Sequence, residues 1–390
     1  MPCNLLIAIL PGVTGLPVGA TATSQPRVRG VSDVYAQPTA AAQPASTGEL
    51  AQYTTLCLGG PAGRVVTATN ADELVSQVRE AGSEILLIAG GSNVVIGDAG
   101  FPGTVVLVRS RGLRVLAEDE QTVTIRVEAG EPWDDLVAAT VRNGWSGLEC
   151  LSGIPGSTGA TPIQNVGAYG QEVAETIIAV QVYDRIAGTV GQVETTACGF
   201  AYRSSIFKCN ERWVVLSVDF RLARSPLSGP VRYAELARAL GVEVGDRVPL
   251  AQARSTVLRL RAGKGMVLDA GDPDTRSVGS FFTNPILDAA AYEHLRQRAV
   301  DLGEPPSWPG AGDTVKVSAA WLIDKAGFGK GYSGPGGTAI STKHTLALTN
   351  PTGAASTDAL LTLAREIRDG VHARFGVSLH PEPVLINCTL

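Results

Sequence analysis

The sequence predicts an α+β protein of two or three compact units, and three observations support this fold class. The chain has 390 residues, more than the roughly 150 of one ordinary domain. Its apolar share of 44% and its charged share of 18% are typical of a globular protein with a sizeable core. Short strand patterns dominate before about residue 225, and helical patterns dominate after it. We therefore expect a domain boundary near that position.

Residues 1–48 are rich in Ala, Thr, Pro, Gly, Ser and Gln and show no sustained periodicity. Such a composition does not repay its ordering entropy, so we predict a disordered leader. Leu5–Val18 resembles the apolar core of a signal peptide, but no Lys or Arg precedes it. A signal, a disordered leader and a wrongly assigned start remain the three alternatives.

The first ordered unit is expected to be a short β-α-β motif that ends in a glycine turn. We expect a strand over Arg64–Ala68, then a helix capped by Asn70 and ended by Gly82. Ile85–Ile88 is an unbroken apolar run, typical of a strand covered on both faces. It leads into Gly90–Asn93, whose backbone N–H groups are suited to holding a diphosphate. An ordinary connecting turn is the alternative for this tetrapeptide.

A second glycine segment follows further along the chain. Gly153, Gly156 and Gly159 recur every third residue, unlike a hairpin turn, and offer a second donor surface for the same ligand. Neither glycine segment has the Rossmann or P-loop spacing, so a bound dinucleotide requires another architecture. Pro132 is expected at the first position of the helix that precedes this segment. Further strands are expected at 104–108, 123–128, 177–183 and 213–222.

After Pro226 the patterns change to those of helices. Leu379–Ile386, near the end of the chain, is short and strand-like, and we expect it to return to the first unit. The helices are expected at 233–240, 250–261, 288–302, 318–326 and 357–375.

The charge balance argues against nucleic-acid binding. With 32 basic and 37 acidic side chains, the formal net charge is −5, which offers no attraction to phosphate backbones. No apolar run reaches the ~20 residues that cross a membrane, so we expect no membrane partner. The six cysteines lack C-x-x-C pairs and nearby histidines, and we therefore expect no metal site.

Six segments, in the family's own order, resemble the UDP-N-acetylenolpyruvoylglucosamine reductase (MurB) family. They are Ala89–Asn93, Gly153–Ser157, Pro162–Gly170, Tyr202–Lys208, Gly279–Pro285 and His380–Glu382. The resemblance runs from about Tyr53 to the end of the chain. It implies a non-Rossmann, two-part FAD-binding domain of the PCMH/vanillyl-alcohol-oxidase type and a C-terminal α+β substrate-binding domain. The implied divisions are an FAD-binding region over 49–224, with subdomains of roughly 49–112 and 113–224, a substrate-binding domain over 225–376, and a segment over 377–390 that returns to the FAD domain.

The resemblance also implies an oxidoreductase of peptidoglycan precursor synthesis, and hence a role in cell-wall biogenesis, cell shape and cell division. Such an enzyme holds FAD non-covalently and takes hydride from NADPH. It reduces the enolpyruvyl ether of UDP-N-acetylglucosamine to UDP-N-acetylmuramate. We expect a cytoplasmic monomer whose partner is this small sugar nucleotide.

By resemblance, three residues act on the substrate. Arg203 matches the catalytic arginine, whose guanidinium can hold the substrate carboxylate while negative charge grows on its oxygens. Ser280 matches the serine that delivers a proton to the carbanionic carbon, which a hydroxyl does only beside a strongly basic intermediate. Glu382 matches the C-terminal glutamate. It either stays protonated and donates to the carboxylate, or stays ionised and orients Arg203.

The resemblance assigns further residues to ligand binding. The flavin contacts are Gly90, Gly91, Ser92, Asn93, Ile154, Pro155, Gly156, Ser157, Gly159 and Ala160. The substrate contacts are Tyr202, Tyr233, Lys264 and Asn284. The lysine suits a phosphate as a point charge. The chain departs from the family pattern at Thr283 and at Pro383-Val384, which bears on substrate affinity.

Two other functions are alternatives. One is a sugar or alcohol oxidase on the same flavin architecture, of which several link their flavin to a histidine. No histidine of this chain lies near either glycine segment in the sequence, but Cys150 keeps a cysteinyl link open; the histidines are His294, His344, His372 and His380. The other is a non-catalytic flavin or nucleotide-binding module whose helical C-terminal half binds a partner protein.

Overall fold

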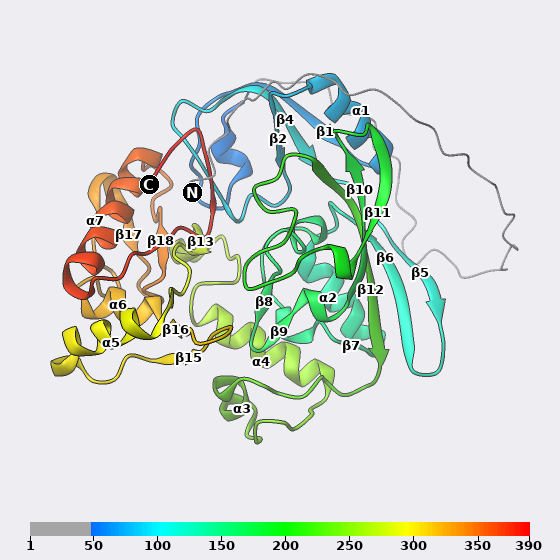
Figure 1. Cartoon of the computed structure of the whole chain (residues 1–390). Helices are drawn as coiled ribbons and strands as arrows, with labels where there is room; N and C mark the ends of the chain where they lie inside the picture. Colours follow the sequence, from blue (N-terminus) through cyan, green and yellow to red (C-terminus); the bar gives the residue numbers. More distant parts are fainter. Residues whose placement is uncertain (1–47) are drawn as a thin grey trace, which may run out of the picture.

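The computed structural model describes residues 48–390. The predictions for the leader therefore lie outside the described residues, apart from Gly48. Figure 1 shows a long antiparallel sheet on one side of the molecule and a group of C-terminal helices on the other. Helices and strands are mixed along the chain, which confirms the predicted α+β class.

A small parallel sheet lies in the N-terminal part. Its strands stand in the order β1 (Ala62–Ala68), β4 (Phe101–Val108) and β2 (Ile85–Ile88). Helix α1 (Ala71–Ala81) begins where the side chain of Asn70 accepts a hydrogen bond from Glu73 N at 2.9 Å, and it ends at Gly82, whose φ is 65°. Both predicted ends are confirmed, because a side-chain cap and a glycine with positive φ are local signals.

Strand β2 is present but less buried than predicted. It lies at the edge of the sheet, and only Ile88 is fully buried. Leu86 and Leu87 keep accessible surface and line a cavity. The expectation of complete cover was wrong, because an apolar run that borders a ligand cavity has the same sequence pattern as one covered by protein on both faces.

A larger antiparallel sheet follows. Its strands stand in the order β11 (Thr189–Glu194), β10 (Ile177–Asp184), β12 (Trp213–Arg224), β6 (Thr122–Glu128) and β5 (Leu113–Glu118), with β7 (Trp145–Ser146) paired to the end of β12. The alternation predicted for residues 123–128 is confirmed, since Val123, Ile125 and Val127 are buried and their neighbours are partly exposed.

Helix α2 (Trp133–Arg142) packs on this sheet. The ring centroids of Trp133 and Phe220 are 6.1 Å apart in the largest hydrophobic core. Pro132 is the N-cap and not the first helical residue, so the predicted start was one residue too early. Proline fits both the N-cap and the first helical position, because the N–H of neither position takes part in a hydrogen bond within the helix. The sequence therefore leaves the start uncertain by one residue.

The C-terminal part combines helices with short strands. The helix predicted over 288–302 ends at Arg298, and a 3₁₀ turn, Val300–Leu302, follows. Only Leu295 is buried in that helix, so little packing is available to hold a longer one. The helices are α3 (Ala234–Leu240), α4 (Leu250–Ala262), α5 (Ala289–Arg298), α6 (Ala319–Lys325) and α7 (Thr357–Phe375).

Three pairs or triplets of short strands complete the fold. The first sheet has the order β13 (Ser277–Ser280), β18 (Ala347–Thr349) and β17 (Ala339–Ile340), and the second has the order β14 (Ile286–Leu287), β16 (Val315–Val317) and β15 (Ser307–Pro309). A hairpin pairs β8 (Gly167–Ala168) with β9 (Gln171–Glu172). The remaining 3₁₀ turns are Leu50–Tyr53, Glu149–Leu151, Thr158–Ala160, Val173–Glu175, Thr195–Ala197, Pro273–Thr275 and Pro335–Gly337.

The C-terminal segment pairs with the N-terminal part of the chain. Strand β19 (Val384–Ile386) runs parallel to β3 (Val94–Ile96), and Val384 N donates to Asn93 O at 3.0 Å. Of the strand predicted over 379–386, only these last three residues form a strand. Pro383 does not disturb the pairing, because the ladder begins at the next residue. Within residues 48–390, no helix has the length and apolar character to cross a membrane.

Candidate active site

A cavity of about 420 Å³ lies between several elements of the fold. Residues of β2, β4, β12 and β13 line it, together with Glu382 from the segment before β19. This volume is in the range of small-molecule sites. All ten residues predicted to contact the flavin line it. Arg203, Ser280 and Glu382 line it as well. The structure thus brings together residues from five separate segments of the sequence.

The two glycine segments touch each other at the cavity wall. A Cβ atom on Gly90 would stand 2.6 Å from Gly156 Cα, so no larger side chain fits there. Ser92 Oγ donates a hydrogen bond to Pro155 O at 3.0 Å. The two segments therefore form one continuous surface, as the sequence predicted for a shared ligand.

Part of the second segment is occupied by bonds within the protein. The amides of Thr158, Gly159 and Ala160 donate to Glu131 O, Ala129 O and Ser157 O at 2.8, 2.8 and 3.0 Å. These three N–H groups are not available as ligand donors. The donor surface of the second segment is therefore narrower than its glycine spacing indicates.

Arg203 and Glu382 form an ion pair at the cavity. Arg203 Nε donates to Glu382 Oε1 at 2.9 Å, and Arg203 Nη2 donates to Gly167 O at 2.9 Å. The backbone of Arg203 has a φ of 51°, a conformation that costs a non-glycine residue energy and often occurs at functional sites. Glu382 N donates to Phe281 O at 2.9 Å, which ties the glutamate to the residue after Ser280.

Burial and charge oppose each other at Glu382. Burial raises the pKa of its carboxyl, while the nearby Arg203 and Lys208 act to lower it, and burial prevails. Lys208 Nζ donates to Arg203 O at 3.0 Å, and burial lowers the pKa of this lysine. The geometry is compatible with both roles expected for Glu382, as a proton donor or as the group that orients Arg203.

Arg261 is a cavity residue that the sequence did not single out. Its Nη2 donates to Met266 O at 2.9 Å, but its Nε is buried and has no hydrogen-bond partner. Burial lowers the pKa of the guanidinium to about 10, so it remains charged at neutral pH. A dehydrated cation with an unmet donor favours a ligand with acceptor or anionic atoms. With the apolar wall and the glycine surface, this arrangement fits FAD.

Comparisons with known proteins agree with this site. A family model described as the UDP-N-acetylenolpyruvoylglucosamine reductase C-terminal domain matches residues 272–386, and one described as an FAD binding domain matches residues 62–194. The reductase of Salinispora arenicola is 75% identical over 91% of this chain and 99% of its own length. The chain belongs to the UDP-N-acetylenolpyruvoylglucosamine reductase family.

Two further relatives cover most of this reductase chain. The enzyme of that name from Thermobifida fusca is 56% identical over 87% of this chain and 97% of its own length. The crystal structure of the Thermus caldophilus reductase matches with a TM-score of 0.61 at 24% identity, over 88% of this chain and 99% of that chain, which supports the fold. The predicted flavin-dependent reductase family and its FAD cofactor are thereby confirmed.

Two residues expected to bind substrate in this reductase gather around Tyr169. The Tyr233 ring meets the Tyr169 ring edge-on, with centroids 5.7 Å apart, and Lys264 Nζ lies 5.6 Å from the Tyr169 centroid. Lys264 also forms an ion pair with Glu235 at 2.7 Å. Neither Tyr233 nor Lys264 lines the cavity. The ammonium group of Lys264 is thus already paired with a carboxylate.

The other two expected substrate residues form a second pair. Burial raises the pKa of the Tyr202 hydroxyl, and Asn284 acts to lower it; the Tyr202 ring lies 5.4 Å from the guanidinium carbon of Arg203. Asn284 Oδ1 accepts from Ala319 N at 2.9 Å. Lys316 Nζ lies 4.7 Å from the Tyr202 ring centroid, which adds a cation that the sequence did not single out. This pair too lies outside the cavity lining.

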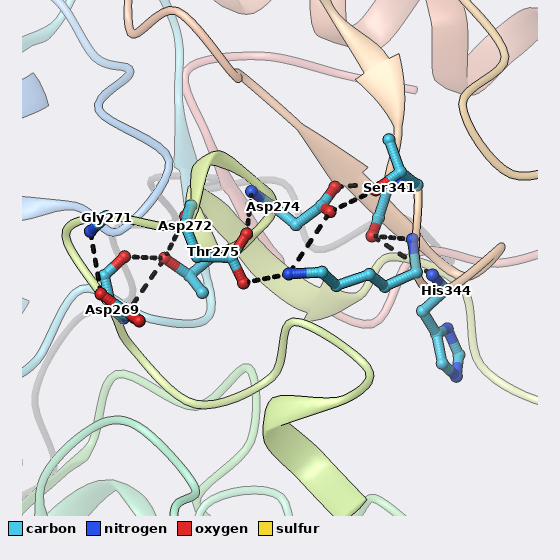
Figure 2. A network of polar contacts seen from close by, with 9 residues as sticks. Asp269, Gly271, Asp272, Asp274, Thr275, Ser341 and His344 are labelled. Atoms are coloured by element: carbon cyan, nitrogen blue, oxygen red, sulfur yellow. Dashed lines mark hydrogen bonds and ion pairs between the residues drawn. The ribbon is translucent and has the colours of Figure 1, made fainter.

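A polar network holds one wall of the reductase cavity to the loop before β18 (Figure 2). Asp274 accepts from Thr342 N and Thr342 Oγ1 at 2.9 and 2.6 Å. Lys343 Nζ donates to Asp272 at 2.5 Å and lies 4.0 Å from Asp274. Burial opposes ionisation of Asp274, but the hydrogen bonds from Thr342 and Ser341 and the charge of Lys343 together lower its pKa. The segment so held leads directly into the strand that carries Ser280.

The geometry does not favour a covalent flavin link. Among the described residues that line the cavity there is no cysteine and no histidine. Cys150 is buried elsewhere, and burial raises its pKa to about 12, so its thiol is a poor nucleophile. In residues 48–390, no group of His, Cys, Asp or Glu side chains is arranged to hold a metal ion.

Proposed function

We propose that the chain reduces the enolpyruvyl ether of UDP-N-acetylenolpyruvoylglucosamine to UDP-N-acetylmuramate, with NADPH as the hydride donor. This is the reaction of UDP-N-acetylmuramate dehydrogenase (EC 1.3.1.98) in peptidoglycan precursor synthesis. The supporting observation is that Arg203, Ser280 and Glu382 line the cavity formed by the glycine segments. FAD, held by the two glycine segments, would supply the redox chemistry that links the nicotinamide donor to the substrate alkene.

Arg203 stabilises the charge that develops on the substrate. Addition of hydride to the enol ether leaves negative charge on the carbon next to the carboxylate, and this charge delocalises into the carboxylate oxygens. The guanidinium is held by Glu382 and by Gly167 O, so it is oriented before the substrate arrives. A fixed cation in a partly dehydrated site stabilises such charge more than a mobile one.

Ser280 supplies the proton to the carbanionic carbon. Its position is well determined, because Phe281 N donates to Leu346 O at 2.7 Å and both Phe281 and Phe282 are buried. The hydroxyl is a weak acid and acts only on a strongly basic carbon. Glu382, whose backbone is bonded to Phe281, either shares a proton with the substrate carboxylate or keeps Arg203 in place.

The four remaining residues are proposed to bind the sugar nucleotide outside the cavity. Lys264 and Tyr233 form one side, and Tyr202 and Asn284 form the other. In this arrangement the enolpyruvyl group enters the cavity and the diphosphate stays between the two pairs. Lys264 exchanges its contact with Glu235 for a phosphate oxygen, as a flexible ammonium group allows.

The need for NADPH leads us to place the reaction in the cytoplasm. We also propose that the protein is a monomer.

We propose that the chain is divided into three parts. These are an FAD-binding region over 49–224, a substrate-binding domain over 225–376 and a segment over 377–390 that returns to the FAD-binding region. The short β19–β3 ladder supports the last of these.

The direct test is NADPH consumption, followed by absorbance, with and without the enolpyruvyl sugar nucleotide. We expect oxidation of NADPH only when the substrate is present, and one UDP-N-acetylmuramate formed per NADPH. Anaerobic assays remove the contribution of oxygen. Oxidation that proceeds equally without the sugar nucleotide, and that stops when oxygen is removed, would instead indicate an oxidase.

A further inference from the structure

Trp213 is a cavity residue whose ring is held by two charged neighbours. It is the first residue of β12 and lines the cavity. The guanidinium carbon of Arg212 lies 4.3 Å from its ring centroid. Asp184 accepts from Arg212 Nε and Nη2 at 3.0 and 2.6 Å. The ring is therefore fixed by a stacked cation, which is itself fixed by a carboxylate with two contacts.

Trp213 lies at one end of the β10–β12 ladder, and the segment that Arg203 contacts leads into the other end. In the pairing of β10 with β12, Asp184 faces Trp213 at one end and Ile177 faces Phe220 at the other. Arg203 donates a hydrogen bond to Gly167 O. The segment that contains Gly167 is held by a hydrogen bond from Val173 N to Val166 O, and it continues into Ile177. Because β10 has 8 residues, its two ends are roughly 25 Å apart.

The glycine surface meets the same sheet between these two ends. Gly159 N donates to Ala129 O, and Ala129 N donates to Leu216 O, at 2.8 and 2.9 Å. Leu216 stands between Trp213 and Phe220 on β12. The cavity thus offers, in order along the sheet, the catalytic end at Arg203, the glycine surface and the aromatic ring of Trp213. FAD has the same order of parts: a reacting ring, a diphosphate and an adenine.

We infer that Trp213 is the aromatic wall of the adenine end of the FAD site, and that Arg212 and Asp184 are positioning residues that fix the plane of its ring. Arg212 covers one face of the ring, so the ligand meets the other face or an edge. Planar bases stack on aromatic side chains whatever their hydrogen-bonding pattern. The inference rests on the proposed placement of the reacting ring beside Arg203.

Other residues that line the cavity are tied to the turn of chain that follows Asp184. Leu86 and Leu87 of β2 line the cavity directly after α1. Arg185 Nη2 donates to Gly82 O at 2.6 Å, and Arg79 Nη2 donates to Gly188 O at 3.0 Å. The end of α1 is thus bonded to the β10–β11 turn, next to Asp184. These bonds tie the residues before β2 to the turn after Asp184, and β2 and Trp213 both line the cavity.

The test compares FAD with FMN, which has the same reacting ring but no adenine. The full-length chain is freed of flavin and titrated with each compound, and binding is followed by flavin fluorescence. Trp213→Leu keeps an apolar side chain and removes the aromatic ring. We expect its affinity for FAD to fall about tenfold and its affinity for FMN to stay as in the unsubstituted chain. Trp308→Leu, a change at a ring outside the cavity lining, is the matched control and changes neither affinity.

Each outcome decides the matter. An equal loss of FAD and FMN affinity in Trp213→Leu means a general structural role, and no loss of either means no contact; both overturn the inference. Arg212→Met, which keeps the apolar stem and removes the cation, is the second variant and weakens FAD binding alone by a smaller factor. The titrations contain no substrate and no NADPH. A result that overturns the role of Trp213 is therefore distinguishable from a failure of the proposed reaction.

Discussion

Arg203 Nε donates a hydrogen bond to Glu382 Oε1 at 2.9 Å, across 179 positions of sequence. The exposed fractions of the two side chains are only 22% and 18%. In such a partly dehydrated place, the protonation of the glutamate depends on its burial and on the cation beside it. The pH dependence of stability therefore reports on this pair.

Glu382→Gln removes a carboxyl whose pKa is raised by burial, despite the opposing effect of Arg203. A group with a raised pKa contributes stability that is present below its unfolded pKa of ~4.3 and is lost as the pH rises through the folded value. Glutamine does not titrate. We therefore expect the melting temperature of the variant to rise relative to that of the unsubstituted protein as the pH rises above about 4. Thermal melts at constant salt measure this difference, and the opposite trend would show that ionised Glu382 stabilises the fold.

Ser280→Ala separates the two halves of the reaction. We expect reduction of FAD by NADPH to stay nearly intact, and reoxidation by the sugar nucleotide to slow by roughly 10²- to 10⁴-fold, because only the second half needs the proton. Stopped-flow absorbance of the flavin measures both. Ser277→Ala is the matched control, since Ser277 lies on the same strand and also lines the cavity. It should affect both halves alike, and the same pattern in Ser280→Ala would refute the proton-donor role.

The sequence predicted those parts of the fold and site that depend on local signals. The strand over residues 123–128 follows from alternation, the start of α1 from its Asn70 cap, and the shared ligand surface of the two glycine segments from their composition. Arg203, Ser280 and Glu382 each stand in a recognisable motif. Their roles stay predictions, although their presence in one cavity is an observation.

Other parts depend on burial and on which segments meet. Arg261 matters because its Nε is buried without a partner, and Trp213 because it faces the cavity under Arg212. Neither property is visible in a linear sequence, since it arises from contacts between distant segments. The exposure of β2 has the same origin. Tertiary packing, and not propensity, also ends the helix at Arg298.

Arg261→Met should have opposite effects on the flavin-free and the flavin-bound protein. Without FAD, the variant should be more stable by about 1–3 kcal/mol, because a buried cation with an unmet Nε donor is removed. Its affinity for FAD should fall roughly 10- to 100-fold. Thermal melts of the flavin-free chain and FAD titration measure the two effects.

Arg254→Met is the matched control for that prediction. Arg254 donates to both carboxylate oxygens of Asp134 at 2.7 and 2.8 Å and does not line the cavity. Its loss leaves Asp134 without this partner, so the flavin-free chain should become less stable. If Arg261→Met also destabilised the flavin-free chain, then Arg261 would be a structural residue and not a ligand-binding one.

Asp274→Asn tests the network that holds the segment leading to Ser280. The carboxylate of Asp274 is only 8% exposed and accepts two hydrogen bonds from Thr342. At about pH 7 we expect the variant to be less stable by roughly 1–3 kcal/mol. The lowered pKa of Asp274 means that this contribution is present above the unfolded pKa of ~3.9 and is lost as the pH falls through the folded value. The difference in stability between the two proteins should therefore narrow in acid.

Urea denaturation at about pH 7 and in acid measures this difference. The control is Asp269→Asn, a change at an exposed site in the same loop. Equal losses in both variants would assign the effect to the loop in general, and a gap that widens in acid would contradict an ionised Asp274.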